Sequence, residues 1–580
     1  MIPFLVFISD YNNSREIFFF AKKKKNSSRK IPMATVEEVG RGGMVTICLP
    51  PLSKEDPLLS GKKRLSDARN LKFKYQLPAS SSTEEVLQIL DQIVQATRIL
   101  HMDEIELYFA GDDDCGPYSP RNELESLNSI LIVINSLLSG AKNDIIQVLH
   151  VLKNRIMTMI NSVAVQNIHE MIIEKLDADT EEMLLTWGED HGVRTKLKIS
   201  YFKEAGRGAV ASEDLSIGDI ALEIPESLII SEDLVRESDM YDPLKKLDGI
   251  ASDTMLLLWS MRERYNSNSR FKIYFDTLPE EFNTGLSFGV DALSVLEGTL
   301  LLEELLQARE LLHQQYDALC PKLCANYPNI FQQELYTWDK FLWACELWYS
   351  NGMKVVLSDG KLGTCLVPIA GLLNHSLCPH ILHYGRVDQS TKSLKFHVSR
   401  PCKAGEQCYL SYGTFPGSHL ITFYGFLPKG DNPYDVIPLD FDDCCNEDGR
   451  SNETWTGESS RTTHMVRGAW LSKSDRPHTY GLPPPLLAHL RSVLKGDGIE
   501  EPPEVPKADM HKEHERAVLK TVLSIFNPML EGIGDSDDFD WDNSRWDVKL
   551  AFDYKDLQRR IISSVTKSCY SGLEMLDASA

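Results

Sequence analysis

Two β-prone, glycine-punctuated regions lie on either side of a long helical pattern in this sequence. The first region includes "TKLKISYF" and "EAGRGAVASEDLSIGDIALEIP", and the second includes "SLKFHVSRPCKAGEQCYLSYG". Short alternating runs bounded by glycine and proline are typical of small, strongly turned strands. Residues 231–350 carry leucine and tryptophan at helical spacing, which predicts core-facing helices. We therefore expect an α+β domain over residues 181–430, with small sheets interrupted by a helical insert.

The regions before and after this domain differ from it in composition and period. Residues 1–80 are polar, rich in serine and lysine and without sustained periodicity, which predicts a mostly disordered arm. Residues 81–180 repeat leucine, isoleucine and valine at helical spacing, which predicts a helical accessory region. Residues 431–580 start as an acidic loop and regain a helical pattern, which predicts a separate C-terminal helical domain.

The charge balance limits the classes of partner. The 580 residues include 61 lysines and arginines against 84 aspartates and glutamates, which gives a formal net charge of −23. Phosphate binding needs a concentrated basic face, so we expect no nucleic-acid partner. No apolar run approaches the roughly 20 residues that a membrane span needs, so we expect no membrane partner. Solvated carboxylates explain most of the negative charge, although an acidic surface also suits a partner that carries lysines.

Cysteine usage bears on compartment and metal binding. The 12 cysteines are irregularly spaced, which indicates no disulfide framework and favours a reducing, intracellular location. Cys320 and Cys324 have ligand-like separation but no matching pair, so buried thiols are favoured over zinc and no metal is expected. The N-terminal stretch runs from apolar patches to a lysine tract at 22–25, the reverse of a secretory signal. Plastid, cytoplasm and nucleus stay open, as does an alternative start at Met33.

Three short motifs, far apart in the sequence, carry the functional signal. They are "EAGRGAVA" at 204–211, "NHS" at 374–376, and "YLSYG" at 409–413, the last followed by "LITFYGFLP" at 420–428. Each motif alone is a common turn, polar loop or strand end. In this order they resemble a SET-domain protein methyltransferase. The helical insert and C-terminal helices resemble the class typified by the Rubisco large-subunit lysine methyltransferase and the actin-histidine methyltransferase.

This resemblance implies a fold and a cofactor. The NHS segment would be threaded under a loop as a pseudoknot, and the strand of the third motif would end at Tyr412 and Gly413. The C-terminal domain would bind the protein substrate. Methyl transfer from S-adenosylmethionine is an in-line displacement, so alignment and desolvation would supply most of the catalysis. The implied cofactor-binding residues are Ala205, Gly206, Arg207, Gly208, Asn374, His375, Tyr412 and Phe426.

The resemblance also assigns individual roles. Tyr412 is the expected catalytic residue, because its phenol would lie beside the transferring methyl group. Tyr424 is expected to bind substrate as the wall of an apolar channel, which would lower the pKa of a lysine from its free value of about 10.4. Gly206 and Gly208 would let the backbone approach the cofactor. Arg207 would contribute main-chain groups and leave its side chain in solvent.

Two departures from the class pattern accompany the match. Relatives commonly carry an aspartate where this chain has Gly371 and an arginine where it has Asn351, so two polar contacts near the cofactor would be missing. Tyr424 and Met353 favour a lysine acceptor over a histidine acceptor. We expect a protein-lysine N-methyltransferase that acts on a non-histone protein. A weak or inactive SET-fold binding scaffold and a protein-histidine methyltransferase stay open as alternatives.

Overall fold

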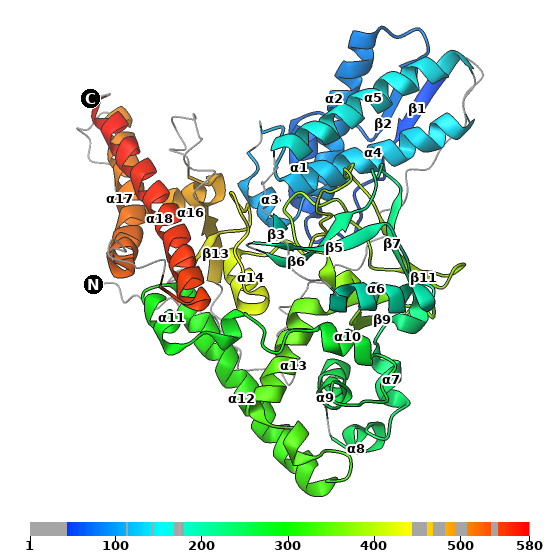
Figure 1. The fold of residues 1–580 in the computed structure, drawn as a ribbon. Coiled ribbons are helices and arrows are strands. Elements are labelled where there is room, and N and C mark those ends of the chain that lie inside the picture. Colours follow the sequence, from blue (N-terminus) through cyan, green and yellow to red (C-terminus); the bar gives the residue numbers. More distant parts are fainter. Residues whose placement is uncertain are drawn as a thin grey trace, which may run out of the picture.

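The computed structural model divides into an N-terminal unit, a central sheet-containing domain and a C-terminal helical unit (Figure 1). The described residues are 43–111, 114–140, 143–166, 173–174, 179–203, 205–247, 249–442, 461–467, 482–494, 507–534 and 543–578. Among them, no helix combines the length and the apolar character that crossing a membrane requires.

The N-terminal unit combines a two-stranded sheet with a helical bundle. Its elements are β1 (Met44–Cys48), α1 (Leu59–Ala68), β2 (Lys74–Pro78), α2 (Thr83–His101), α3 (Glu104–Phe109), α4 (Pro120–Gly140) and α5 (Asn143–Gln166). Helix α2 starts at a capping box in which the Ser82 hydroxyl accepts from the Glu85 N–H. The apolar faces of α2, α4 and α5 form one core with the inward side chains of β1 and β2.

The expectation of a disordered arm over residues 1–80 is wrong for its second half. Strands β1 and β2 pair antiparallel from Met44↔Pro78 to Cys48↔Lys74. Val45, Ile47 and Leu77 are buried in the core of the helical bundle. Each strand has only five residues, which is too short for periodicity to stand out from the polar surroundings. Residues 1–42 lie outside the described part of the chain.

The central domain contains three small sheets and the expected insert. Strands β5 (Leu197–Phe202) and β6 (Gly206–Ala211) form a hairpin, which β3 (Ile173–Glu174) extends. The second sheet has the order β10-β11-β7-β4, with β4 (Arg194–Thr195), β7 (Ile220–Pro225), β10 (Val387–Asp388) and β11 (Ser393–His397). Leu394 pairs with Ile224, so strands from both sides of the insert meet in this sheet. The third sheet pairs β8 (Met353–Val356) with β9 (Leu362–Cys365).

The insert is helical and lies between β7 and β8 in the sequence. Its elements are η1 (Glu226–Leu228), α7 (Glu232–Arg236), α8 (Tyr241–Lys245), α9 (Ser252–Glu263), α10 (Lys272–Thr277), η2 (Gly285–Ser287), α11 (Val290–Val295), α12 (Leu300–Asn326), η3 (Gln333–Leu335) and α13 (Trp338–Asn351). Trp343 and Trp348 of α13 are buried in the same core as the sheets. The tryptophan stripe is therefore core, as its helical spacing predicts.

The NHS segment and the third motif are interleaved. After η4 (Ala370–Leu372), residues 374–376 run beside residues 409–411, with the Leu410 N–H donating to Asn374 O and the Ser376 N–H donating to Leu410 O. Leu410 forms parallel bridges with both His375 and Ile381. The 409–411 segment thus lies between two passes of the chain, which is the threaded arrangement that the resemblance implies. The regular strand expected to end at Tyr412 is wrong, because this segment pairs only around Leu410.

The C-terminal unit packs against the insert. Its elements are β12 (Ile437–Asp442), β13 (Arg461–Val466), α16 (Pro484–Leu494), α17 (Lys507–Ile533) and α18 (Trp546–Ala578), and the preceding helix α14 (Gly417–Tyr424) belongs to the central domain and contacts α13 and η2. Helices α17 and α18 share an apolar core with α16, and α18 also contacts α11. The pairing of β12 with β13 was not predicted, because their sequences lie beside an acidic, loop-like stretch.

Candidate active site

The glycine motif forms the start of β6, directly after the β5–β6 turn. Gly206 has φ +64°, and a Cβ placed on it would meet open space, so its backbone is accessible and in a conformation that favours glycine. A Cβ on Gly208 would lie 2.8 Å from Phe202 Cε2 and 2.9 Å from Asn374 Nδ2. Gly208 is therefore needed for packing within the protein. Ala205 is exposed at the turn, and Glu204 lies outside the described residues.

The prediction of a solvated Arg207 side chain is wrong. Its Nη1 donates to Glu181 Oε1 at 3.0 Å and also to the Thr277 carbonyl oxygen. Glu181 is 4% exposed. Its buried carboxylate therefore needs the positive charge of the Arg207 guanidinium as a partner. The pair joins β6 to α6 (Asp179–Asp190) and to the end of α10. No local pattern links Arg207 with Glu181, and the sequence therefore did not reveal the contact.

Asn374 connects the glycine motif to the NHS segment. Its Nδ2 donates to Arg207 O at 2.9 Å and to Gln407 Oε1 at 3.2 Å. A carbonyl oxygen can only accept, so these contacts fix the orientation of the Asn374 amide. Asn374 Oδ1 has no hydrogen-bond partner within the described ranges, and the side chain is partly exposed. The residue therefore presents an acceptor toward whatever occupies the space beside the glycine motif.

His375 is held as a neutral imidazole. Its Nδ1 accepts from the Tyr412 N–H at 3.0 Å, so the ring proton is on Nε2. Burial lowers the pKa of His375 to about 4. The ring lies 5.2 Å from Tyr412 and 6.1 Å from Phe426, centroid to centroid. A neutral histidine adds no positive charge that would repel a cationic ligand at this place.

The two tyrosines expected to form the reaction site lie together. The rings of Tyr412 and Tyr424 stack with centroids 4.8 Å apart and an interplanar angle of 20°, while Phe426 meets Tyr412 edge-on at 6.3 Å. The Tyr412 hydroxyl donates to Leu373 O at 3.2 Å. Burial raises the pKa of both tyrosines well above the usual value of 10, so both remain neutral phenols. All three aromatic side chains are partly exposed.

Helix α14 and its contact with the insert set the position of Tyr424. Helix α14 ends at Gly425, which has φ +76° and would overlap Asn283 O if it carried a Cβ, at 1.6 Å. Behind this contact, Glu346 of α13 accepts from Thr284 Oγ1 and Ser287 Oγ, both at 2.6 Å. Burial raises the pKa of Glu346 to about 7. The insert therefore fixes where Tyr424 stands.

Two residues at the site were missed by sequence reasoning. Tyr384 donates its hydroxyl to Ser411 O at 2.7 Å and interacts electrostatically with Tyr412. Burial raises its pKa to about 12. Gln407, 4% exposed, accepts from Asn374 and has no partner for its Nε2 among the described residues. Neither residue belongs to one of the three motifs, so the sequence did not single them out.

The two departures from the class pattern are neighbours in space. A Cβ on Gly371 would lie 2.8 Å from Asn351 Oδ1. Asn351, the last residue of α13, donates its Nδ2 to Ser350 Oγ at 2.8 Å. The positions are 20 residues apart in the sequence. A side chain introduced at position 371 would therefore contact Asn351 directly.

Within the described ranges, one group has metal-ligand chemistry: His380, Cys402 and Cys408, all fully buried. His380 Nδ1 accepts from the Tyr409 N–H at 3.0 Å, so its proton is on Nε2, which donates to Glu406 Oε1 at 3.0 Å. Neither nitrogen has a free lone pair for a metal ion. The group is better explained as a hydrogen-bonded part of the core.

Comparisons with known proteins agree with this geometry. The SET domain family matches residues 206–413. The chain is 26% identical over 264 residues to the actin-histidine N-methyltransferase of Gallus gallus, which covers 44% of each protein. It is 26% identical over 322 residues to the chloroplastic ribulose-1,5 bisphosphate carboxylase/oxygenase large subunit N-methyltransferase of Pisum sativum, covering 53% of this chain and 63% of that protein.

A solved structure supports the fold. The crystal structure of the SET domain of LSMT bound to lysine and AdoHcy superposes with a TM-score of 0.51 at 22% identity, covering 70% of this chain and 94% of that one. The chain spans less than two thirds of the length of both curated relatives named above. Residues 206–413 form a SET domain, in a chain similar to both the Rubisco large-subunit and the actin-histidine methyltransferases.

Proposed function

We propose that this chain is an S-adenosylmethionine-dependent protein-lysine N-methyltransferase that acts on a non-histone protein. The observation that carries the proposal is the assembly of His375 with Tyr412 and Tyr424, which lie 37 and 49 residues later, into one partly exposed aromatic site. Solved relatives bind AdoHcy and lysine, and the curated relatives modify proteins. The proposed location is intracellular.

The residues present fit the cofactor. S-adenosylmethionine is a methyl donor that carries a cationic amino group, and Asn374 Oδ1 is an acceptor without a protein partner in the described part of the chain. Gly206 offers accessible backbone next to it. Neutral His375 and the edge of Phe426 complete an uncharged, aromatic surface. These groups would hold and orient the donor without repelling it.

The acceptor side follows from the stacked tyrosines. A lysine nitrogen attacks only after losing its proton, and an apolar aromatic channel disfavours the ammonium form. Tyr412 and Tyr424 provide two neutral faces for such a channel. Their phenol oxygens are acceptors that would orient the nitrogen for in-line attack, while Tyr412 stays tied to Leu373 O. No residue needs to change protonation for the displacement itself.

Histidine methylation is the second candidate, because the chicken actin-histidine enzyme is as similar to this chain as the pea lysine enzyme is, at 26% identity each. Tyr424 and Met353 favour lysine, since the resemblance associates the histidine enzyme with different residues at both positions. The two reactions differ only in the amino acid that receives the methyl group. Analysis of the modified residue therefore separates them.

The test is calorimetric titration of S-adenosylhomocysteine into the full chain, followed by transfer of a labelled methyl group from S-adenosylmethionine to proteins of a cell extract. We expect one-to-one binding, methyllysine in the hydrolysed product, and loss of transfer with retained binding in Tyr412→Phe. Tyr570→Phe on the exposed face of α18 is the matched control. Methylhistidine would establish the second candidate. A flat titration on folded protein would indicate a binding scaffold and overturn both.

A further inference from the structure

The N-terminal unit shares its core with residues 374–383, the threaded segment that begins with Asn374. Cys378, four residues after Asn374, is 1% exposed and belongs to the apolar cluster of α2, α4 and α5. Its Sγ lies 3.9 Å from Val163 O of α5. Leu382 of the same threaded segment packs against this cluster as well. The back of the candidate site is therefore continuous with the interior of the N-terminal bundle.

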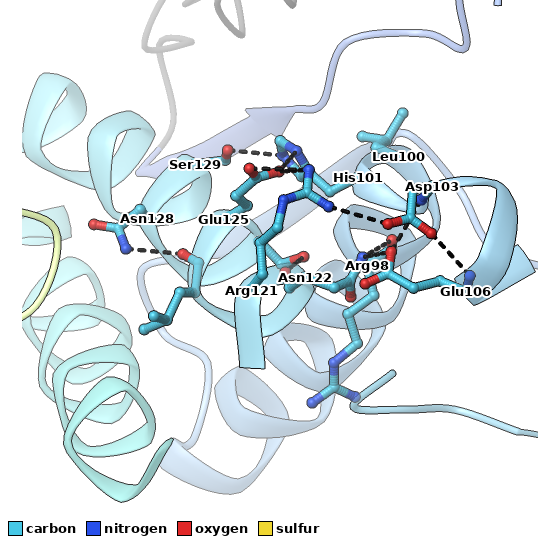
Figure 2. A network of polar contacts seen from close by, with 12 residues as sticks. Arg98, Leu100, His101, Asp103, Glu106, Arg121, Asn122, Glu125, Asn128 and Ser129 are labelled. Atoms are coloured by element: carbon cyan, nitrogen blue, oxygen red, sulfur yellow. Dashed lines mark hydrogen bonds and ion pairs between the residues drawn. The ribbon is translucent and has the colours of Figure 1, made fainter. Parts of the chain in front are cut away.

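A partly buried polar network joins α2, α3 and α4 within the N-terminal unit (Figure 2). Arg121 of α4 pairs with Asp103 at 3.5 Å and with Glu125 at 3.1 Å, and so links α4 to the start of α3. Three described residues from outside the N-terminal unit interact electrostatically with this network. They are His383 of the threaded segment, which acts on Glu125, and Arg467 and the buried Tyr434, which both act on Asp103.

Helix α3 reaches the C-terminal unit. The Tyr108 hydroxyl accepts from the Met465 N–H at 3.1 Å and forms a second hydrogen bond, 3.1 Å long, with His464 Nδ1. The Arg467 guanidinium stands over the Phe109 ring, 4.3 Å from its centroid. Both contacts connect α3 to the strand β13 and the residue after it. The N-terminal unit thus contacts the threaded segment at one place and the C-terminal unit at another.

We propose that the N-terminal unit, residues 43–166, is a built-in positioning element that holds the threaded segment 374–383 in its binding conformation and fixes β13 relative to it. Hydrogen bonds to residues 399–412 hold the threaded segment on its central-domain side, and on its other side Cys378 and Leu382 pack against the N-terminal unit. The assignment of what the site binds rests on the proposed function. The positioning of residues 374–383 by the N-terminal unit does not depend on which ligand the site binds.

Linkage gives the proposal a direct test. If the bundle holds the segment that binds cofactor, bound cofactor must in turn stabilise the bundle by the same free energy. Hydrogen exchange on the full chain, with and without S-adenosylhomocysteine, should therefore show added protection in α5 as well as in residues 374–383. Exchange in α5 that is unchanged by the ligand, while 374–383 becomes protected, would overturn the proposal.

Matched cavity variants extend the test. Leu152→Ala and Leu519→Ala both remove a fully buried leucine, the first from the core of the N-terminal unit and the second from that of the C-terminal unit. We expect Leu152→Ala to speed exchange in residues 374–383 and to weaken S-adenosylhomocysteine binding at least threefold, and Leu519→Ala to do neither. Equal effects of the two variants on residues 374–383 would refute a specific role of the bundle.

A milder variant covers the case in which Leu152→Ala fails to fold. Tyr108→Phe removes only the hydroxyl between Met465 and His464. We expect faster exchange in residues 461–467 with little change in α17. If the parent chain binds no S-adenosylhomocysteine, the proposed function fails. The exchange of residues 374–383 in Leu152→Ala and 461–467 in Tyr108→Phe still decides whether the bundle positions them.

Discussion

Replacing Gln407 with leucine should separate cofactor binding from stability. Gln407 is 4% exposed, and its Oε1 accepts from Asn374 Nδ2 at 3.2 Å. The orientation of its amide is set through Asn374, whose Nδ2 must face the Arg207 carbonyl. Gln407 Nε2 is then left as a buried donor without a partner among the described residues.

The two effects on stability have opposite signs. The variant loses one hydrogen bond, worth about 0.5–1.5 kcal/mol, and also removes an unpartnered buried donor that costs about 1–3 kcal/mol. The net change in the free energy of unfolding therefore lies between a loss of about 0.5 kcal/mol and a gain of about 2.5 kcal/mol. Asn374 keeps only one of its two acceptors, so its Oδ1 is no longer held toward the ligand. Losing a hydrogen bond of about 1.4 kcal/mol weakens binding about tenfold.

The assay combines urea unfolding with calorimetric titration of S-adenosylhomocysteine into the full chain. Gln558→Leu is the matched control, because Gln558 is 3% exposed on α18 and its Oε1 also has no partner in the described part of the chain. Gln407→Glu keeps an acceptor for Asn374 but buries a charge, so it should bind well and unfold easily. A Gln407→Leu variant that binds as the parent chain does, while its stability falls by more than about 2 kcal/mol, would refute this reasoning.

Three further predictions concern the surroundings of the site. Gly425→Ala should lower the free energy of unfolding by more than about 2 kcal/mol, because its Cβ would overlap Asn283 O; a urea midpoint near that of the parent would contradict the close approach of the α14 end to the insert. Burial raises the pKa of Glu346 from 4.5 to about 7, so the folded state retains a proton that the unfolded state releases. The free energy of unfolding therefore falls as the pH rises between these values. The free energy of unfolding of Glu346→Gln, compared with that of the parent, should be more favourable at pH 8 than at pH 5. An equal difference at both pH values would show that the Glu346 carboxyl does not cause the pH dependence. Gly371→Asp should weaken S-adenosylhomocysteine binding or folding by facing Asn351 Oδ1. Adding Asn351→Arg should restore much of the loss, and additive effects in a double-mutant cycle would show that the positions are uncoupled.

Local patterns predicted the elements that are long or strongly periodic. The helices of the insert and the buried Trp343 and Trp348 follow from helical spacing of apolar residues. The hairpin of β5 and β6 follows from alternation around a turn rich in glycine. Strands β1 and β2 were not predicted, because five residues of alternation inside a polar stretch give a weak signal. Tertiary packing nevertheless buries Val45 and Leu77.

Contacts between distant residues were predictable only through the resemblance or not at all. The order of motifs implied that Tyr412, Tyr424 and His375 meet, and their ring contacts agree with it. The resemblance did not include the pairing of Arg207 with Glu181. A side chain judged alone at a turn looks solvated, because a buried partner 26 residues earlier leaves no trace in local composition.

The contact between Gly371 and Asn351 changes the meaning of the two departures from the class pattern. Considered separately, a missing aspartate and a missing arginine suggest two lost cofactor contacts. Because the positions adjoin, the resemblance implies that relatives place opposite charges against each other there. Removing one partner of a close ion pair leaves an uncompensated charge, which is strongly destabilising when buried, whereas removing both leaves none. A double-mutant cycle that couples the two positions would make the glycine and the asparagine one compensated change, which weighs less against a functional site than two independent losses.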